Sequence, residues 1–139
     1  MGQKRWACAI AALVLALCLP FGLSAQPATA PDIVARGWLV LVDKGNYQSS
    51  WEQAGSVFKT RVTAQAWGSA AASARAPMGA IVTRTMPKVT TSSTLAGLPD
   101  GQYAVVQFTS AFASKASAVE TVSLQMESGH WAVIGYFIR

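Results

Sequence analysis

The chain has 139 residues, of which 52% are hydrophobic and 12% are charged, and its formal net charge is +5. This length fits one domain, and the hydrophobic share is large enough to form a buried core. The cations are scattered and form no basic block interleaved with aromatic residues, so we expect no nucleic-acid partner.

The first 25 residues have the composition of a cleavable signal peptide. Lys4 and Arg5 form a basic start, residues 7–19 are almost wholly apolar, and Ala25 supplies a small residue for cleavage. The apolar run is shorter than the ~20 residues that a membrane-spanning helix needs. We therefore predict cleavage after Ala25 and a periplasmic or secreted protein. Cleavage after Ala30 and an uncleaved anchor are the alternatives.

Removal of residues 1–25 changes the apparent chemistry of the chain. It removes Cys8 and Cys18, which are the only cysteines, and Lys4 and Arg5, so that the net charge falls from +5 to +3. The mature protein then has no disulfide and no thiolate metal site. We predict a short leader at residues 26–30 and one domain at residues 31–139, which we expect not to span a membrane.

The first part of this domain has helical periodicity. A first helix begins near Pro31, and Gly45 is a natural stop for it. A second helix begins near residues 46–49, where Ser49 and Glu52 have the spacing of a capping box. Thr63 is the predicted cap of a third helix. The apolar stripes of these helices contain Val34, Trp38, Val42, Trp51, Phe58 and Trp67.

From Ala80 onward, β-branched and alternating residues predict strands. Four segments have this pattern, at residues 81–89, 102–112, 118–126 and 131–138. Turn residues separate them, among them Pro99-Asp100-Gly101 and Ser128-Gly129. The predicted fold class is α+β, with about three N-terminal helices packed on a curved four-stranded antiparallel sheet.

Several short motifs resemble domain-of-unknown-function family 4019, a family of exported bacterial proteins. They are Trp38-x4-Asp43-x-Gly45-x-Tyr47-x2-Ser50-Trp51, Arg75-x-Pro77-x-Gly79-x4-Arg84, Pro99-Asp100-Gly101-x-Tyr103, Glu120-Thr121-Val122 and Gly129-x-Trp131-x-Val133-x-Gly135-Tyr136. This chain departs from the family pattern at Ala132, where we expect a basic residue. The resemblance implies no reaction. The layout also looks like the cone-shaped folds of the nuclear transport factor two-like superfamily, whose members include enzymes, binding proteins and dimerisation modules.

Side-chain parity indicates a buried pair of opposite charges. Alternate residues of a strand share a face, so Glu120 lies with the apolar residues of 118–126, and Arg84 lies between Val82 and Met86. An unpaired buried charge costs several kcal/mol or more. We therefore predict that Arg84 and Glu120 form a buried ion pair. The alternatives are that one or both faces lie toward solvent at a sheet edge, or that Arg84 holds a small anion.

Arg75 is a second candidate cation for this polar site. A candidate pocket or rim is formed by aromatic and acidic residues, namely Trp38, Asp43, Tyr47 and Tyr136. Asp43 and Tyr47 straddle Gly45 and could serve acid–base chemistry in a cavity. The structural interpretation is that Asp43 closes the first helix or bonds turn amides, that Tyr47 packs beside it, and that Trp38 belongs to the core.

The sequence contains no assignable catalytic, cofactor or metal site. His130 is the sole histidine and follows a predicted turn, where we expect it to be solvated. The acids have no spacing typical of metal ligands. We predict a non-catalytic domain of the cell envelope that binds a small ligand or a partner protein. The alternatives are a small cone-fold enzyme with carboxylate and tyrosine groups in a cavity, and a structural module that forms a homodimer.

Overall fold

The structure, a computed structural model, describes residues 26–85 and 87–139. The predicted signal peptide, its cleavage point after Ala25 and both cysteines lie outside the described residues, and so does Met86. Within the described part, no helix is long and apolar enough to cross a membrane.

Helices precede the sheet, as the α+β prediction requires. They are α1 (Pro31–Asp43), α2 (Tyr47–Glu52), α3 (Ser56–Arg61), α4 (Ala64–Arg75) and a 3₁₀ turn η1 (Ala76–Met78). Thr63 is confirmed as the cap of α4, because its Oγ1 accepts a hydrogen bond from the N–H of Ala66 at 3.2 Å. The prediction of three helices is wrong by one, since the predicted second helix is α2 and α3.

The break between α2 and α3 has a steric cause at Gly55. Its N–H donates to the carbonyl of Val133 at 2.7 Å, which brings the helical layer against β5 (His130–Ile138). A Cβ at this position would displace the Glu127 carboxylate and lie 3.1 Å from Ala132 Cβ and 3.2 Å from Ile134 Cγ2, so glycine eases the close approach. Ser49 lies inside α2 and is not a cap.

The sheet has five antiparallel strands rather than the predicted four. They are β1 (Ile81–Arg84), β2 (Lys88–Ser92), β3 (Tyr103–Phe112), β4 (Lys115–Glu127) and β5. The order is β1-β3-β4-β5, and β2 also pairs with β3. The predicted strand at 81–89 is interrupted before Lys88. Pro87 stands at this interruption and has no N–H to give to a ladder.

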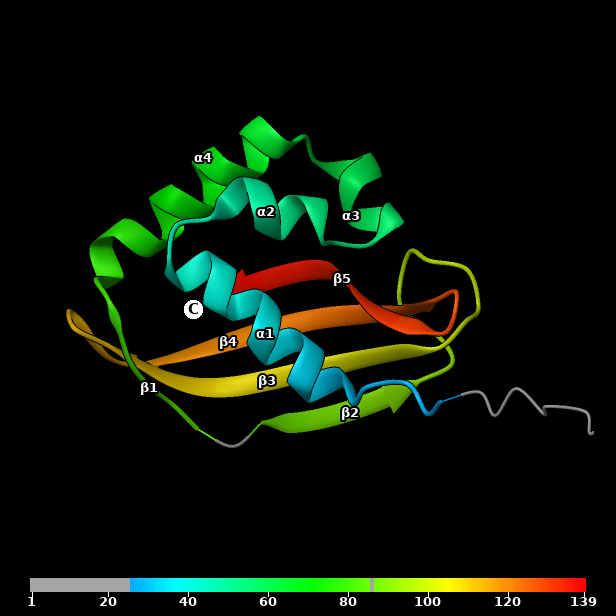
Figure 1. The fold of residues 1–139 in the computed structure, drawn as a ribbon. Helices are drawn as coiled ribbons and strands as arrows, with labels where there is room; N and C mark the ends of the chain where they lie inside the picture. The colour runs from blue at the N-terminus through cyan, green and yellow to red at the C-terminus, as the bar shows by residue number, and fades with distance from the viewer. Residues whose placement is uncertain (1–25, 86) are drawn as a thin grey trace, which may run out of the picture.

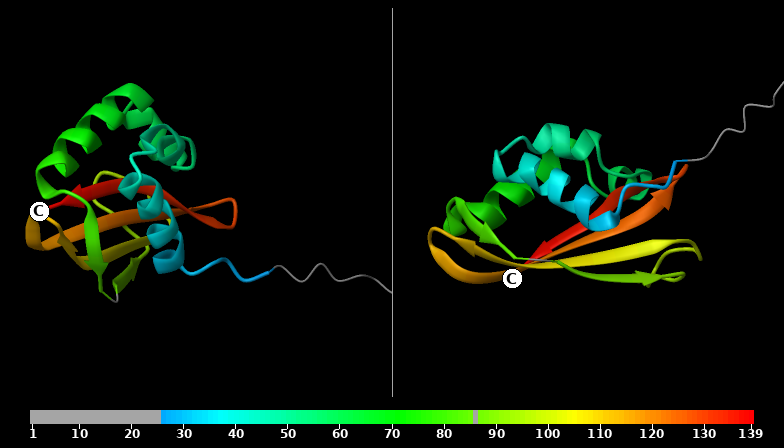
Figure 2. Two further views of the ribbon diagram at one scale, coloured as in Figure 1. Left: turned by 60° about the vertical axis from the view of Figure 1, so that its left-hand side comes forward. Right: turned by 60° about the horizontal axis from the view of Figure 1, so that its bottom comes forward.

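The helices cover one face of the sheet, and no described helix lies on the other face (Figures 1 and 2). Side chains of β3 and β4 alternate accordingly: Val106, Phe108, Val122 and Leu124 point toward the helices and are fully buried. The core therefore lies between the two layers. Ser128 and Gly129 both have positive φ, as the predicted tight hairpin between β4 and β5 requires.

An aromatic cluster joins the helices to the sheet. Trp38, Phe58, Trp67 and Tyr136 contact one another with ring centroids 5.1–6.3 Å apart. Ser50, which is fully buried, serves both indoles: the Trp38 Nε1–H donates to its carbonyl at 2.8 Å, and the Trp67 Nε1–H donates to its Oγ at 2.9 Å. Ser50 thus satisfies two buried donors in the core.

Replacement of Ser50 by alanine is expected to lower the free energy of unfolding by about 1–3 kcal/mol, because the Trp67 indole N–H would lose its buried acceptor. Urea denaturation measures this loss. Ser49→Ala on the same helix is the control and should cost less than about 0.5 kcal/mol. Equal losses in the two variants would contradict the role assigned to Ser50.

Candidate functional site

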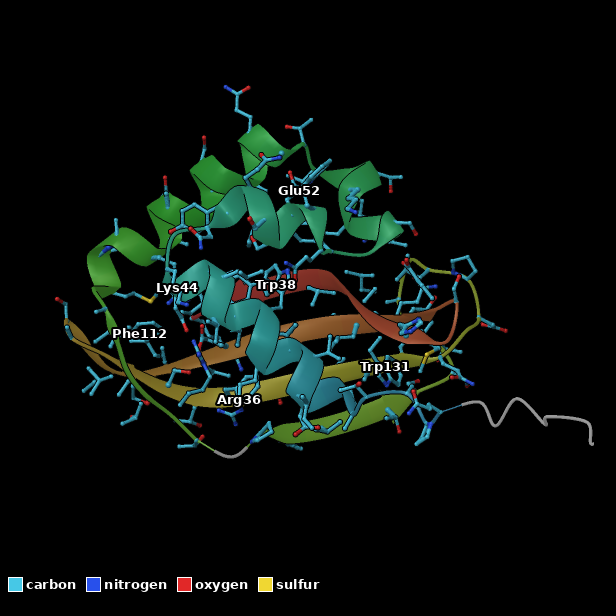
Figure 3. The ribbon with its side chains drawn as sticks, in the orientation of Figure 1. Arg36, Trp38, Lys44, Glu52, Phe112 and Trp131 are labelled. Carbon is cyan, nitrogen blue, oxygen red and sulfur yellow. The ribbon has the colours of Figure 1, made fainter. Side chains whose placement is uncertain are left out.

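Four charged side chains from four elements meet between the helices and the sheet. Asp43 ends α1, Arg75 ends α4, Arg84 ends β1 and Glu120 lies in the middle of β4. We call these four residues the charge cluster. Their side chains are 12%, 8%, 8% and 0% exposed, in that order. Asp43 precedes Lys44, and Arg75 packs on Phe112, so the cluster lies toward the end of the molecule where Figure 3 labels these two residues; Trp131 is labelled near the opposite end.

Arg84 binds both carboxylates of the cluster. Its Nη1 and Nη2 donate to Asp43 Oδ2 and Oδ1 at 2.9 and 3.0 Å, which is a bidentate pair. Its Nε donates to Glu120 Oε2 at 2.7 Å. The predicted partners Arg84 and Glu120 are therefore brought into direct contact.

Arg75 also bridges the two carboxylates. Its Nη2 donates to Asp43 Oδ1, and its Nη1 donates to Glu120 Oε1 at 3.2 Å. Each guanidinium thus contacts each carboxylate, so two cations and two anions form a closed ring. Such mutual pairing is what buried charges need, because each ion loses its hydration.

Neutral side chains complete the hydrogen bonding of Glu120. The Tyr136 hydroxyl donates to Oε1 at 2.8 Å, and the Ser110 hydroxyl donates to Oε2 at 2.5 Å. The Phe112 ring lies under Arg75, with its centroid 4.7 Å from the guanidinium carbon. Every buried polar side-chain atom of the charge cluster has a hydrogen-bond partner. Among the described residues, the buried side-chain atom that lacks one is Gln125 Oε1.

The surroundings hold Asp43, Arg75, Arg84 and Tyr136 in their ordinary charge states at neutral pH. Burial by itself raises the pKa of Asp43, but hydrogen bonds from Arg84 and Arg75 outweigh it and lower the pKa. Burial lowers the pKa of each guanidinium, and the bonds to Asp43 more than offset this. Burial, together with the charge of Glu120, raises the pKa of the Tyr136 hydroxyl.

The lowered pKa of Asp43 makes stability depend on pH. The ordinary value is 3.8, so the ionised carboxylate contributes stability above pH 3.8, and this contribution is lost as pH falls through the lower folded-state value. We expect the free energy of unfolding to fall between about pH 5 and pH 2. Urea denaturation over this range measures it. Asp43→Asn should reduce the dependence of the free energy of unfolding on pH. Asp100→Asn, in an exposed turn, is the control and should behave as the wild type does. The same pH dependence in all three proteins would contradict this role of Asp43.

Glu120 and Arg84 both point inward, as side-chain parity predicts, but Val82, which was expected to share the inward face with Arg84, does not. Val82 is 65% exposed, because the pairing of β1 with β3 shifts register between Ile81 and Thr83. Arg84 pairs with Ser110, which is buried, and so points inward despite this bulge. Met86, the other residue invoked for that face, lies outside the described residues.

Other predicted site residues have different surroundings. Trp38 is 4% exposed and belongs to the core rather than to a rim. The turn amides of residues 44–46 donate to backbone carbonyls of α1, so Asp43 is not needed there and binds the two arginines instead. Asp43 lies at the C-terminal end of α1, where the negative end of the helix dipole disfavours an anion. Arg75 lies at the C-terminal end of α4, where the same dipole favours a cation. Ser110 also belongs to the site, although its sole signal in the sequence is a small polar residue on the inward parity of β3.

Two open clefts of about 440 Å³ each lie at opposite ends of the molecule. The cleft beside the charge cluster, which we call the Asp43 cleft, is lined by residues that include Asp43, Lys44, Tyr47, Arg75 and Gly79. The second, which we call the Trp131 cleft, is lined by Thr91, Ser92, Ser93, Gly101, Gln102, Tyr103 and Trp131. Tyr47 therefore lines a cleft together with Asp43, as its candidate role requires.

The described residues that line the two clefts include no group of side chains placed to bind a metal ion. Among residues 26–85 and 87–139, no group of three histidine, aspartate or glutamate side chains is placed to bind a metal ion. Asp43 and Glu120 are bound by both guanidiniums. His130 is exposed, as predicted, and its Nδ1 lies 3.0 Å from the carbonyl of Ser128.

Comparison with protein families matches residues 34–136 to the family described as "Protein of unknown function (DUF4019)". The chain belongs to this family. The DUF4019 match spans every member of the charge cluster as well as Ser110, Tyr136 and Trp131. No curated protein and no solved structure matches the chain, so the likeness to the nuclear transport factor two-like superfamily stays a prediction.

Proposed function

We propose that this DUF4019 chain is an exported, non-catalytic domain that binds an uncharged ligand or a segment of a partner protein in the Trp131 cleft. The observation that carries the proposal is the chemistry of this cleft. Among the described residues that line it, none carries a charge, and a half-buried indole lies beside hydroxyl groups and a carboxamide. The Tyr103 hydroxyl donates to the carbonyl of Pro99 at 2.6 Å and is already used. Aromatic and neutral polar groups are typical of binding pockets.

The electrostatics of the charge cluster support binding over catalysis. A general acid or base works best when its pKa lies near the working pH. In this chain the pKa of Asp43 is lowered and that of Tyr136 is raised, so both move away from neutrality. The four charges also satisfy one another, which gives the cluster a structural role in holding α1 and α4 to the sheet.

Export is part of this proposal and rests on the sequence of residues 1–25. Periplasmic or secreted protein should begin at Gln26, leaving the leader 26–30 and the domain 31–139. N-terminal sequencing of the protein recovered from the envelope or the medium tests this. A chain that keeps Met1 and stays in the membrane fraction would indicate the uncleaved anchor, and a chain that begins at Pro31 would indicate the later cleavage site.

The binding proposal is tested by NMR with phenol and N-acetylglucosamine as neutral probes of the two clefts. We expect either probe to shift the Trp131 indole resonance and the amides of Ser92 and Gly101. Trp131→Ala should abolish the shifts of those amides. Shifts confined to Tyr47 and Gly79 would contradict the proposal, because they would assign binding to the Asp43 cleft.

That outcome would favour the second candidate, a small cone-fold enzyme. The observation in its favour is that Asp43 and Tyr47, a carboxylate and a phenol, line one cleft of about 440 Å³.

A third candidate is a homodimer formed through the sheet face that no described helix covers (Figure 2), where Phe137 is 58% exposed. Sedimentation equilibrium separates this candidate from the others, because a monomer at high micromolar concentration would exclude an obligate dimer.

A further inference from the structure

β2 forms an edge of the sheet. Within the described residues it pairs with β3, and no strand lies on its other side. All five of its residues are exposed, and both figures of the fold place it at the margin of the sheet (Figures 1 and 2). An edge strand presents backbone N–H and C=O groups that a further strand can pair with.

The sequence of β2 leaves most of this edge open. Proteins commonly protect edges with bulges, prolines and charges. β1 has the register shift between Ile81 and Thr83, and Pro87 and Lys88 stand at the start of β2. The remaining residues, 89–92, are Val-Thr-Thr-Ser, which lack charge and proline and favour extended backbone.

The open edge leads directly into the Trp131 cleft. Thr91 and Ser92, the last two residues of β2, line that cleft together with Trp131. An extended chain that pairs with β2 would therefore carry a side chain to the mouth of the cleft. Pairing supplies backbone hydrogen bonds, and the cleft supplies side-chain selectivity, which is how β-strand addition works in peptide recognition.

We propose that the partner is an extended peptide segment of another protein that adds to β2 as a further strand. This inference rests on the proposed function of the Trp131 cleft. Residues of β2 alternate between the two faces: Thr91 pairs with Ala104 on the helix-covered face, and Lys88 pairs with Gln107 on the other. The peptide residue opposite Thr91 is large and apolar and enters the cleft. The residue opposite Lys88, three positions away and about 10 Å along the strand, is acidic.

The test uses a library of random nine-residue linear peptides as the probe and the protein as it is recovered from cells. We expect enrichment of sequences with an acidic residue three positions from a large apolar one. In the best peptide, methylation of alternate backbone nitrogens should weaken binding about tenfold or more, because hydrogen bonds to β2 are lost. Trp131→Ala should remove the preference for the large apolar residue only.

Lys88→Glu provides the sharpest arm, since it changes charge without removing backbone groups. The selected position should switch from acidic to basic residues, whereas the control Lys115→Glu, at the exposed start of β4, should leave the selection unchanged. Three results would overturn the proposal. They are no enriched pattern, binding that methylation of neither alternate set of nitrogens weakens, and a dimer in solution that Lys88→Glu disrupts and peptides do not bind. If the neutral probes shift the Trp131 cleft but no peptide binds, the proposed function stands and this inference fails.

Discussion

Glu120→Gln is expected to lower the free energy of unfolding by about 3–5 kcal/mol, because it removes one charge from a buried, compensated set. Glu120 is fully buried and accepts hydrogen bonds from Arg75, Arg84, Ser110 and Tyr136. The amide has nearly the same shape, so packing is preserved. Two guanidiniums would then share the single carboxylate of Asp43, and the excess positive charge would have little hydration, because both guanidiniums are only 8% exposed.

Chemical denaturation of wild type and variant measures this loss at neutral pH. Glu52→Gln is the matched control. Glu52 is exposed and accepts a hydrogen bond from the Gln48 carboxamide at 2.8 Å, so its replacement should cost less than about 0.5 kcal/mol. A Glu120→Gln variant as stable as the control would contradict the interpretation of the cluster as a set of buried, mutually dependent charges.

Trp38→Ala is expected to cost about 3–5 kcal/mol, the range for truncating a large aromatic residue in a core. Trp38 is 4% exposed, contacts the rings of Phe58, Trp67 and Tyr136, and donates to the carbonyl of Ser50. The substitution leaves a large cavity between the helices and the sheet. It also leaves the Ser50 carbonyl without that donor.

Trp131→Ala is the control for this prediction, because Trp131 is half-buried and lines a cleft. It should cost less than Trp38→Ala, since less apolar area is removed from burial. Comparable losses in the two variants would mean that Trp131 is a core residue, and the binding cleft would then lose its main aromatic wall.

The buried pair could be predicted because it violates the hydrophobic pattern. Glu120 stands among apolar residues of the same parity, and burial of a charge demands a partner. The sequence could not show that Asp43 completes the ring. An acid at a helix end beside Gly45 has an ordinary local explanation in turn chemistry, and only the tertiary fold brings it to Arg75 and Arg84.

The fold class could be predicted from periodicity, but the element breaks could not. The predicted strand at 81–89 is divided, and its first part contains a bulge that exposes Val82. The predicted second helix is divided where Gly55 approaches β5. The bulge and the helix break depend on contacts between segments distant in sequence, whereas Pro87 is a local signal for the strand break that the β-branched pattern of 81–89 outweighed.

The Trp131 cleft was outside the reach of sequence reasoning for the same reason. Its walls come from the end of β2, the connection between β2 and β3, the start of β3 and the start of β5. Trp131 alone has the signature of a strand residue that packs in a core. Only its placement beside the exposed edge of β2 gives it a candidate role in binding.

A double-mutant cycle on Arg84→Met and Glu120→Met tests most directly the claim that the charge cluster is a self-compensating structural device. Each single substitution leaves an uncompensated buried charge, whereas the double variant keeps the balanced pair of Arg75 and Asp43. We predict that the double variant loses less free energy of unfolding than the two single variants lose together, with a difference, the coupling energy, of about 1–3 kcal/mol. Strictly additive losses, with no coupling between Arg84 and Glu120, would contradict the account.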